Sequence, residues 1–428
     1  MMRIVISIVL ALCILVLCFT SCSMPLEDGT DVSDENMLLL YDGEKYNLEM
    51  VLPEGSESTI TSPFFALSAK IQELVSSKKP ISYKDDYVKN KQEVDNAKNE
   101  ILVGETNRPA TQSLLKDIHM KMCYKVEVDT DGITIVGNSS SLTAKAINYF
   151  MNEYLSENLV KIDNVYYIRC GEYTSEEDEE ASFIAHAVLS YKSGVDFKYK
   201  IENYMNVVPV GDHWGQQGGC IDKEGNYAYF SFIDLDDNAS LVKYDMRTKQ
   251  VVLTKKNVQT NHSNDIAYNS NNNTIVVSHC TVSPTYVSIF DADTLELIEH
   301  KDIGISQSAI SYNAKRNSYV VKGSGRIRVL DENFKEIFSF AHEPSKYTSQ
   351  GMHCDDDYIY CIRSSGAEVS GNVIYIYDWE GNFIFMMKIP ERTSETESIF
   401  HYGKDLYFTC YRGNRSGASL CKLSLVTE

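Results

Sequence analysis

The chain has 428 residues, of which 43% are hydrophobic, so it can build packed cores in about two or three domains. It carries 60 acidic against 40 basic side chains, which gives a formal net charge of −20 at pH 7. A surface with this charge repels phosphate backbones and anionic lipid headgroups, which excludes nucleic-acid binding and attachment to a membrane through a basic patch.

The N-terminus has the pattern of a bacterial export signal. Arg3 precedes an apolar run over residues 4–19, which is shorter than the about 20 residues of a comfortable membrane span. Residues 19–22 read FTSC and resemble a bacterial lipobox, in which small residues precede a cysteine. The resemblance implies that the Cys22 sulfur receives a diacylglyceryl group and that residues 1–21 are removed as a signal peptide. An uncleaved membrane anchor is the alternative.

Residues 22–36 are expected to form an acidic tether. The segment after Cys22 reads SMPLEDGTDVSDEN, which is polar and acidic and contains no basic stop-transfer cluster. The lipid would then hold the folded body on the extracellular face of the bacterial cell membrane. The uncleaved anchor would also place the body outside the cytoplasm.

Residues 37–171 are predicted to form a small α/β domain, because strand and helix patterns alternate along them. Apolar residues recur at helical spacing over 62–77, and the run NEILVGE at 99–105 is typical of a buried strand. Two further strands are expected over 124–138, and a helix follows them.

This domain resembles a known one. The sequences EILVGETNRPAT at 100–111 and YKVEVDTDGITIVGN at 124–138 are similar to the small α/β domain ahead of the catalytic barrel in family 20 hexosaminidases and α-glucuronidases. In those enzymes the domain is not catalytic. No such barrel follows here, so the resemblance implies a carbohydrate-associated setting without glycosidase activity. The acidic residues 172–195 are expected to be a linker.

Residues 196–428 are predicted to form an all-β propeller. From about residue 214, five segments with one strand–turn–strand pattern repeat every 40–47 residues. Aspartate accepts hydrogen bonds from turn amides, so it is typical of the turn into the fourth strand of a blade. Four repeats end their third strand in this way, with spacings of 46, 40 and 47 residues, at Asp245, Asp291, Asp331 and Asp378.

The fifth repeat ends before its fourth strand. We expect residues 196–206 to supply that strand, so that an N-terminal strand closes a five-bladed ring and leaves no open sheet edge. A sixth, degenerate blade within 183–213 is the alternative. The repeats resemble the YVTN-type and quinoprotein-like propellers of bacteria, with the closest likeness to surface proteins of clostridia-like organisms. This resemblance covers roughly residues 200–428 and implies the propeller fold but no particular function. The whole chain is thus predicted to be multidomain, with the small α/β domain followed by the all-β propeller.

The aligned repeats place one polar residue at the start of each innermost strand, and such strands line the central channel of a propeller. Amides and carboxylates suit a hydroxyl-rich ligand such as a glycan or cell-wall component, and they also suit calcium, which takes 6–8 oxygen ligands. Satisfaction by ordered water is the alternative. The candidate ligand-binding residues are Gln217, Asn264, Ser308, Gln350 and Glu397, with His262, Asp265 and Trp214 beside them.

The leading hypothesis is therefore a membrane-anchored extracellular lipoprotein whose propeller binds a glycan or cell-wall ligand. A glycan hydrolase or lyase that uses Asp265, Glu397 or His262 is the second hypothesis, and a protein-interaction scaffold is the third. None of the eleven cysteines forms a CxxC pair, so no zinc site is expected. No catalytic residue and no cofactor other than the calcium alternative is assigned.

Overall fold

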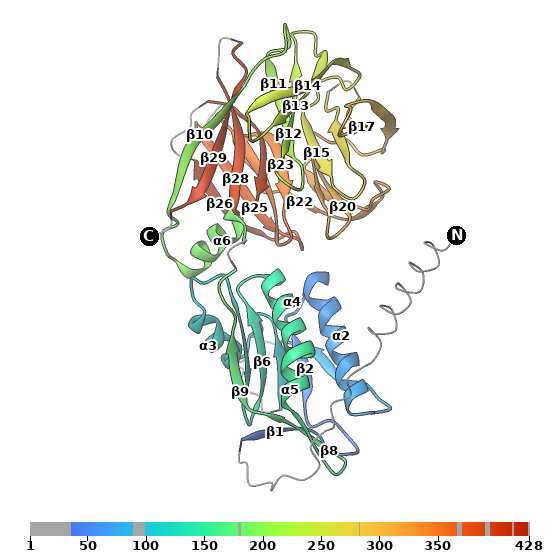
Figure 1. Cartoon of the computed structure of the whole chain (residues 1–428), viewed down its shortest axis with the longest axis vertical. Helices are drawn as coiled ribbons and strands as arrows, with labels where there is room; N and C mark the ends of the chain where they lie inside the picture. Colours follow the sequence, from blue (N-terminus) through green and yellow to red (C-terminus); the bar gives the residue numbers. More distant parts are fainter. Residues whose placement is uncertain are drawn as a thin grey trace, which may run out of the picture.

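The computed structural model describes residues 36–88, 99–178, 181–281, 283–365, 370–389, 394–412 and 415–426. The predicted signal peptide, Cys22 and nearly all of the predicted tether lie outside these residues. Within them, no helix combines the length and the apolar character that a membrane span needs. The chain forms an α/β part and a β-rich part, drawn below and above in Figure 1.

The α/β part is built on a six-stranded sheet with the strand order β3-β2-β4-β6-β5-β9. β3, β2, β4 and β6 are parallel to one another, whereas β5 is antiparallel to both of its neighbours. β4 (Glu100–Val103) is buried along its whole length, as expected for a parallel strand that is covered on both faces. The other strands are β2 (Glu49–Leu52), β3 (Tyr83–Asp85), β5 (Tyr124–Val128), β6 (Gly132–Gly137) and β9 (Gly171–Thr174).

Helices cover both faces of this sheet. Ile135 of β6 shares a core with α2 (Ser58–Leu74) and α4 (Ser140–Tyr149), whereas the next residue, Val136, packs with α3 (Pro109–Asp117). Successive side chains of a strand point to opposite faces, so α2 and α4 lie on one face and α3 on the other.

A smaller sheet closes the far end of the α/β part. α4 continues through a π-helical turn (Phe150–Tyr154) into α5 (Leu155–Asn158). The chain then forms a hairpin that β1 joins, in the order β1-β8-β7. In Figure 1 this sheet lies farthest from the β-rich part. Its strands are β1 (Met37–Tyr41), β7 (Leu159–Ile162) and β8 (Val165–Arg169).

The structure differs from the linker predicted over 172–195. Residues 172–174 belong to β9, which pairs with β5 at the edge of the six-stranded sheet. The segment also contains α6 (Phe183–Ser193), whose apolar side chains pack into a core with residues of both parts. The acidic residues ahead of α6 obscured this helix in the sequence.

The β-rich part is propeller-like and contains, among the described residues, five four-stranded antiparallel sheets. The outermost strands are the most exposed, whereas β24 (Tyr358–Ser364) is buried at every position. From the innermost strand outwards, the first sheet is β11 (Gly215–Ile221), β12 (Tyr227–Ile233), β13 (Ala239–Asp245) and β14 (Gln250–Val258); the second is β15 (Asp265–Asn269), β16 (Thr274–Ser278), β17 (Tyr286–Asp291) and β18 (Leu297–Asp302); the third is β19 (Ala309–Asn313), β20 (Ser318–Gly323), β21 (Arg326–Leu330) and β22 (Glu336–Ala341); the fourth is β23 (Thr348–Cys354), β24, β25 (Asn372–Asp378) and β26 (Phe383–Ile389); the fifth is β27 (Thr396–Tyr402), β28 (Asp405–Tyr411), β29 (Ala418–Leu425) and β10 (Tyr199–Val207).

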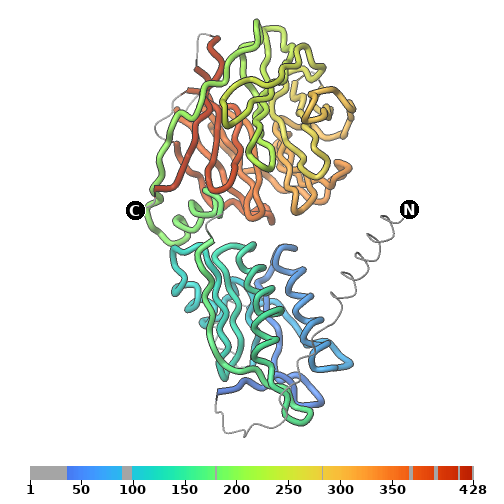
Figure 2. Tube along the Cα trace, in the orientation of Figure 1, coloured from blue at the N-terminus to red at the C-terminus, as the bar shows by residue number. Residues whose placement is uncertain are grey.

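The sheets are arranged in a ring. Each innermost strand contacts the innermost strand of the next sheet, and β27 of the fifth sheet contacts β11 of the first. Apolar side chains fill the spaces between neighbouring sheets; Phe230 of the first sheet and Phe400 of the fifth share one such core. In the fifth sheet β10 lies outside β29 and pairs antiparallel with it, and Figure 2 shows this green segment beside the red one.

The two parts meet where hairpins of the β-rich part reach the starts of helices. The backbone N–H of Ser141 in the first turn of α4 donates to Asp357 Oδ1 at 2.8 Å. The hydroxyl of Ser182, which also caps α6, donates to Asp355 Oδ2 at 2.8 Å. Arg316 pairs with Glu57, the residue just before α2. Carboxylates are favourable at helix starts because the free N–H groups there are partly positive.

Candidate functional site

The predicted ring of polar residues lies at the end of the β-rich part that faces away from the α/β part. β23 ends at Cys354, and Asp355 and Asp357, which follow it, contact the α/β part. β19 likewise ends three residues before Arg316, which pairs with Glu57. The innermost strands therefore run toward the α/β part, so their starts lie at the opposite end.

The ring residues are linked to one another and to the backbone around them. The Asn264 amide nitrogen donates to the Ser308 carbonyl. The Gln350 amide nitrogen donates to Glu395 Oε1 at 2.8 Å, and that of Gln217 donates to the Gln216 carbonyl at 3.2 Å. These bonds also fix the orientation of each amide, because only the nitrogen can donate to such acceptors.

The ring therefore presents oxygen atoms. One N–H of each of the three amides donates to a protein acceptor, and the amide oxygens have no partner among the described residues. The Ser308 hydroxyl likewise donates inward, to the Lys322 carbonyl at 3.2 Å, which leaves its lone pairs available. The ring can therefore offer a ligand hydrogen-bond acceptors from four of the five sheets, together with the second N–H of each amide.

Glu397 completes the ring from the fifth sheet. Burial, with added repulsion from Glu395, raises the pKa of the Glu397 carboxyl well above its usual range. A carboxyl that keeps its proton can both donate and accept a hydrogen bond, as a sugar hydroxyl does. Glu397 is therefore suited to the same hydroxyl-rich ligands as the amide oxygens.

Asp265 lies beneath the ring and is sealed from solvent. Its side chain is 0% exposed, and its carboxylate accepts the backbone N–H groups of Ile266 at 3.0 Å, Ile310 at 3.2 Å and Met352 at 3.0 Å. Three of the five innermost strands thus bind one carboxylate. Burial raises the pKa of Asp265 to about 8, although the three N–H groups act in the opposite direction.

Small residues make room for this carboxylate. The residues ahead of Ile310 and Met352 are Ala309 and Gly351, which correspond to Asp265 in their own strands. A Cβ on Gly351 would meet the Glu397 carbonyl at 2.7 Å, so the backbones approach closely here. Asp265 therefore forms a floor that ties the strands together, which explains its burial without a role in binding or acid–base chemistry.

His262 and Trp214 have partners outside the ring. The Nδ1 of His262 lies 2.9 Å from Asp237 Oδ1. The guanidinium of Arg415 lies 5.5 Å from the ring centroid of Trp214, and the Tyr411 ring lies 6.1 Å away. Both residues remain half-buried, so they are available at the edge of the ring rather than within it. Nowhere in the described part of the chain do three His, Cys, Asp or Glu side chains gather as metal ligands would.

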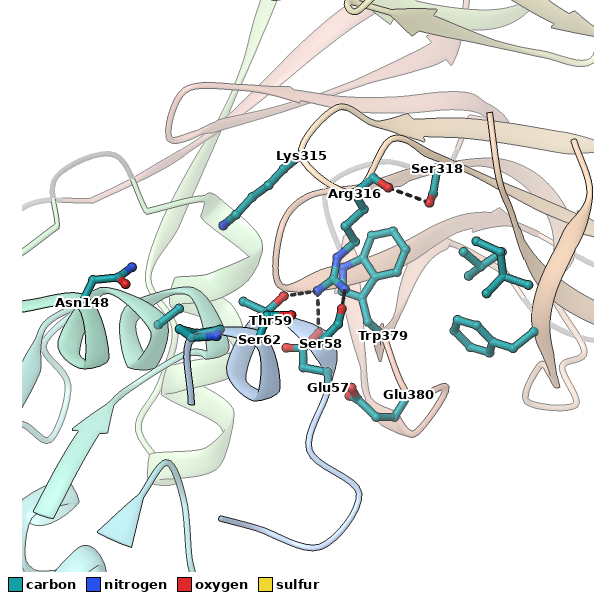
Figure 3. A pocket seen from close by; sticks show the side chains of 15 residues that line it. Glu57, Ser58, Thr59, Ser62, Asn148, Lys315, Arg316, Ser318, Trp379 and Glu380 are labelled. Atoms are coloured by element: carbon teal, nitrogen blue, oxygen red, sulfur yellow. Dashed lines mark hydrogen bonds and ion pairs between the residues drawn. The ribbon is translucent and has the colours of Figure 1, made fainter. Parts of the chain in front are cut away.

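A second candidate site, which the sequence did not indicate, is a cleft of about 830 Å³ between the two parts. Its centre is Arg316, which donates to Glu57 and, at 2.7 Å, to Thr59 Oγ1. The guanidinium also stacks 4.2 Å from the ring of Trp379 (Figure 3). Glu57 and Arg316 are 259 positions apart in the chain, and no local pattern indicates such a pairing.

No family model matches the chain, and no curated protein matches it in sequence. Three solved structures that it resembles are hydrazine synthase of Kuenenia stuttgartiensis (18% identity, TM-score 0.34), a tail fibre of Staphylococcus aureus phage P68 (14%, 0.39) and a nidogen/laminin complex (12%, 0.34). The matches cover 48%, 53% and 46% of this chain and 58%, 52% and 73% of the others. The chain thus spans little more than half the length of the first two.

Proposed function

We propose that this protein is an extracellular, lipid-anchored binding protein. Its β-rich part is then a five-bladed propeller closed by β10, and it binds a hydroxyl-rich ligand, such as a glycan or a cell-wall component, at the ring of Gln217, Asn264, Ser308, Gln350 and Glu397. The α/β part occupies the opposite end of the innermost strands and acts as a spacer toward the membrane.

The observation that carries this proposal is the orientation of the ring amides. One N–H of each amide is bound within the protein, which fixes the amide and leaves its oxygen for a ligand in three of the sheets. Hydroxyl groups can donate to all of these oxygens at once, and they can also accept from a protonated Glu397. The sealed floor at Asp265 supports a binding role over hydrolysis by an Asp265–Glu397 pair.

The test is binding of the full-length protein, kept in detergent, to an array of glycans and cell-wall fragments. Asn264→Ala and Gln350→Ala should each weaken any hit by about fivefold or more, since each removes an oxygen that accepts from the ligand. Asn206→Ala, on the exposed side of β10, is the matched control and should bind normally. Binding that survives both ring substitutions would contradict the proposed site.

The lipid anchor is tested separately, because it concerns residues outside the described part of the chain. Expression in a bacterium with palmitate labelling should give a labelled protein in the membrane fraction. Cys22→Ser should abolish the label and leave an uncleaved precursor. Replacement of Cys18, inside the apolar run, should leave the label unchanged. Equal labelling of the Cys22→Ser protein would contradict the proposed lipidation.

A further inference from the structure

We propose that the cleft between the two parts is a second binding site, and that it takes a small organic amine with an apolar body. The cleft has the size of small-molecule sites, which fill about 300–1,000 Å³ and occur preferentially between domains. It lies at the opposite end of the innermost strands from the polar ring. The inference therefore stands or falls independently of the proposed glycan site.

The apolar body is indicated by the apolar residues that line the cleft. They come from both parts of the molecule: Pro63 of α2 and Ala144 of α4 belong to the α/β part, and Val329, Ile337 and Phe338 belong to the third sheet. Ile337 is 59% exposed, which is high for a large apolar side chain. An apolar ligand body would remove this surface from water.

The positive charge of the ligand follows from the charges around the cleft. Arg316 is paired with Glu57, and Lys315 is paired with Asp356 at 3.2 Å. Glu380, which lines the cleft in Figure 3, has no ion-pair partner among the described residues. The uncompensated charge in the cleft is therefore negative, and an ammonium group complements it.

The surroundings of Glu380 add a dependence on pH. Glu380 is solvent-exposed, but the protein atoms around its carboxyl, with added repulsion from Glu57 and Asp378, raise its pKa to about 7, while Arg316 acts in the opposite direction. Lys315 is the other charged group that lines the cleft. Glu380 is thus mostly ionised at pH 8 and mostly neutral at pH 6, so an amine should bind better at pH 8.

The fluorescence of Trp379 provides a direct measurement. The chain has two tryptophans, so Trp214→Phe leaves Trp379, in the cleft, as the only one. The full-length Trp214→Phe protein in detergent is titrated with phenethylamine, 2-phenylethanol and phenylacetate, which share a phenyl ring and differ in charge. Phenethylamine should bind most tightly and phenylacetate least tightly at pH 8.

Two substitutions separate the contribution of the Glu380 charge from that of the apolar residues that line the cleft. Glu380→Gln should weaken phenethylamine about two- to fivefold, the range for a partly exposed ion pair, and leave 2-phenylethanol unchanged. Ile337→Ser should weaken all three probes. Glu299→Gln, on the exposed strand β18, is the matched control and should change nothing.

Three results would each overturn the inference. These are the absence of a saturable change in Trp379 fluorescence, equal binding of phenylacetate and phenethylamine, and equal losses from Glu380→Gln and Glu299→Gln. Thermal unfolding of each variant checks that the cleft is intact. Because the ring lies at the other end of the molecule, loss of glycan binding would leave these outcomes unaffected.

Discussion

At the scale of single residues, the sequence placed Asp265 among the candidate ligand-binding residues, whereas the structure buries it beneath them. The five polar residues chosen from the repeats lie within three residues of the starts of the innermost strands. The sequence could not distinguish a residue that faces a ligand from one beneath it. The distinction depends on backbone N–H groups of Ile310 and Met352, which belong to two other sheets. Such contacts depend on how the strands are aligned in space.

Replacement of Asp265 tests this structural role. Asp265→Ala leaves three buried N–H groups without an acceptor, and each such group costs about 1–3 kcal/mol. We expect the free energy of unfolding in urea to fall by about 3 kcal/mol or more, and less for Asp265→Asn, which keeps one acceptor oxygen. Glu299→Ala, on an exposed strand, should change it by less than about 0.5 kcal/mol. An equally stable Asp265→Ala protein would contradict the role of Asp265 as a floor.

At the scale of elements, local patterns indicated most helices and strands, because apolar spacing and turn residues are local properties. The alternation along 37–171 and the repeats after residue 214 both correspond to elements of the structure. Residues 172–195 were misread because β9 is stabilised mainly by pairing with β5, and α6 by contacts with both parts. Neither partner is adjacent in the sequence.

The contribution of β10 can be measured on its buried side chains. Met205 is 6% exposed and packs with residues of the first and fifth sheets. Met205→Ala should lower the free energy of unfolding by about 2–4 kcal/mol, because it leaves a cavity in this core. Asn206→Ala, whose side chain points to solvent, is the neighbouring control. Equal effects of the two substitutions would show that β10 is not packed against the ring.

At the scale of the whole molecule, the contact between the two parts could not be predicted. It joins Glu57 to Arg316 and the 355–357 hairpin to the starts of α4 and α6, all over large separations in the chain. The sequence contains the aspartates and serines of this contact, but these residues are equally common in solvated turns. The cleft with Glu380 arises only once both parts are in place.

This contact makes stability depend on pH. Burial raises the pKa of the Asp355 and Asp357 carboxyls to about 6 each, against 3.8 for a free carboxyl. Their contribution to stability is thus complete below about pH 4 and is lost as the pH rises through 6. Burial lowers the pKa of His279 and His401 to about 4, so their contribution is complete above about pH 6.5 and is lost as the pH falls through 4.

Both changes fall between about pH 4 and 6.5, so the loss from the two aspartates and the gain from the two histidines largely offset each other. Asp355→Asn removes one of the losses, so its urea unfolding midpoint should rise more between about pH 4.5 and 7 than that of the unsubstituted protein. Asp302→Asn, on the exposed strand β18, should follow the unsubstituted protein. The same pH dependence in Asp355→Asn and in the unsubstituted protein would contradict this prediction.

The pairing of β10 with β29 cannot form until nearly the whole propeller-like part has been synthesised. β10 ends at Val207 and its partner begins at Ala418, so the 210 residues from 208 to 417 must be made after β10 before its partner appears. At about 5–20 residues per second this takes roughly 10–40 s, during which β10 has no strand to pair with. The ring can close only after β29 has been made, so the protein passes through a period with an exposed strand that a chaperone or another nascent chain could bind.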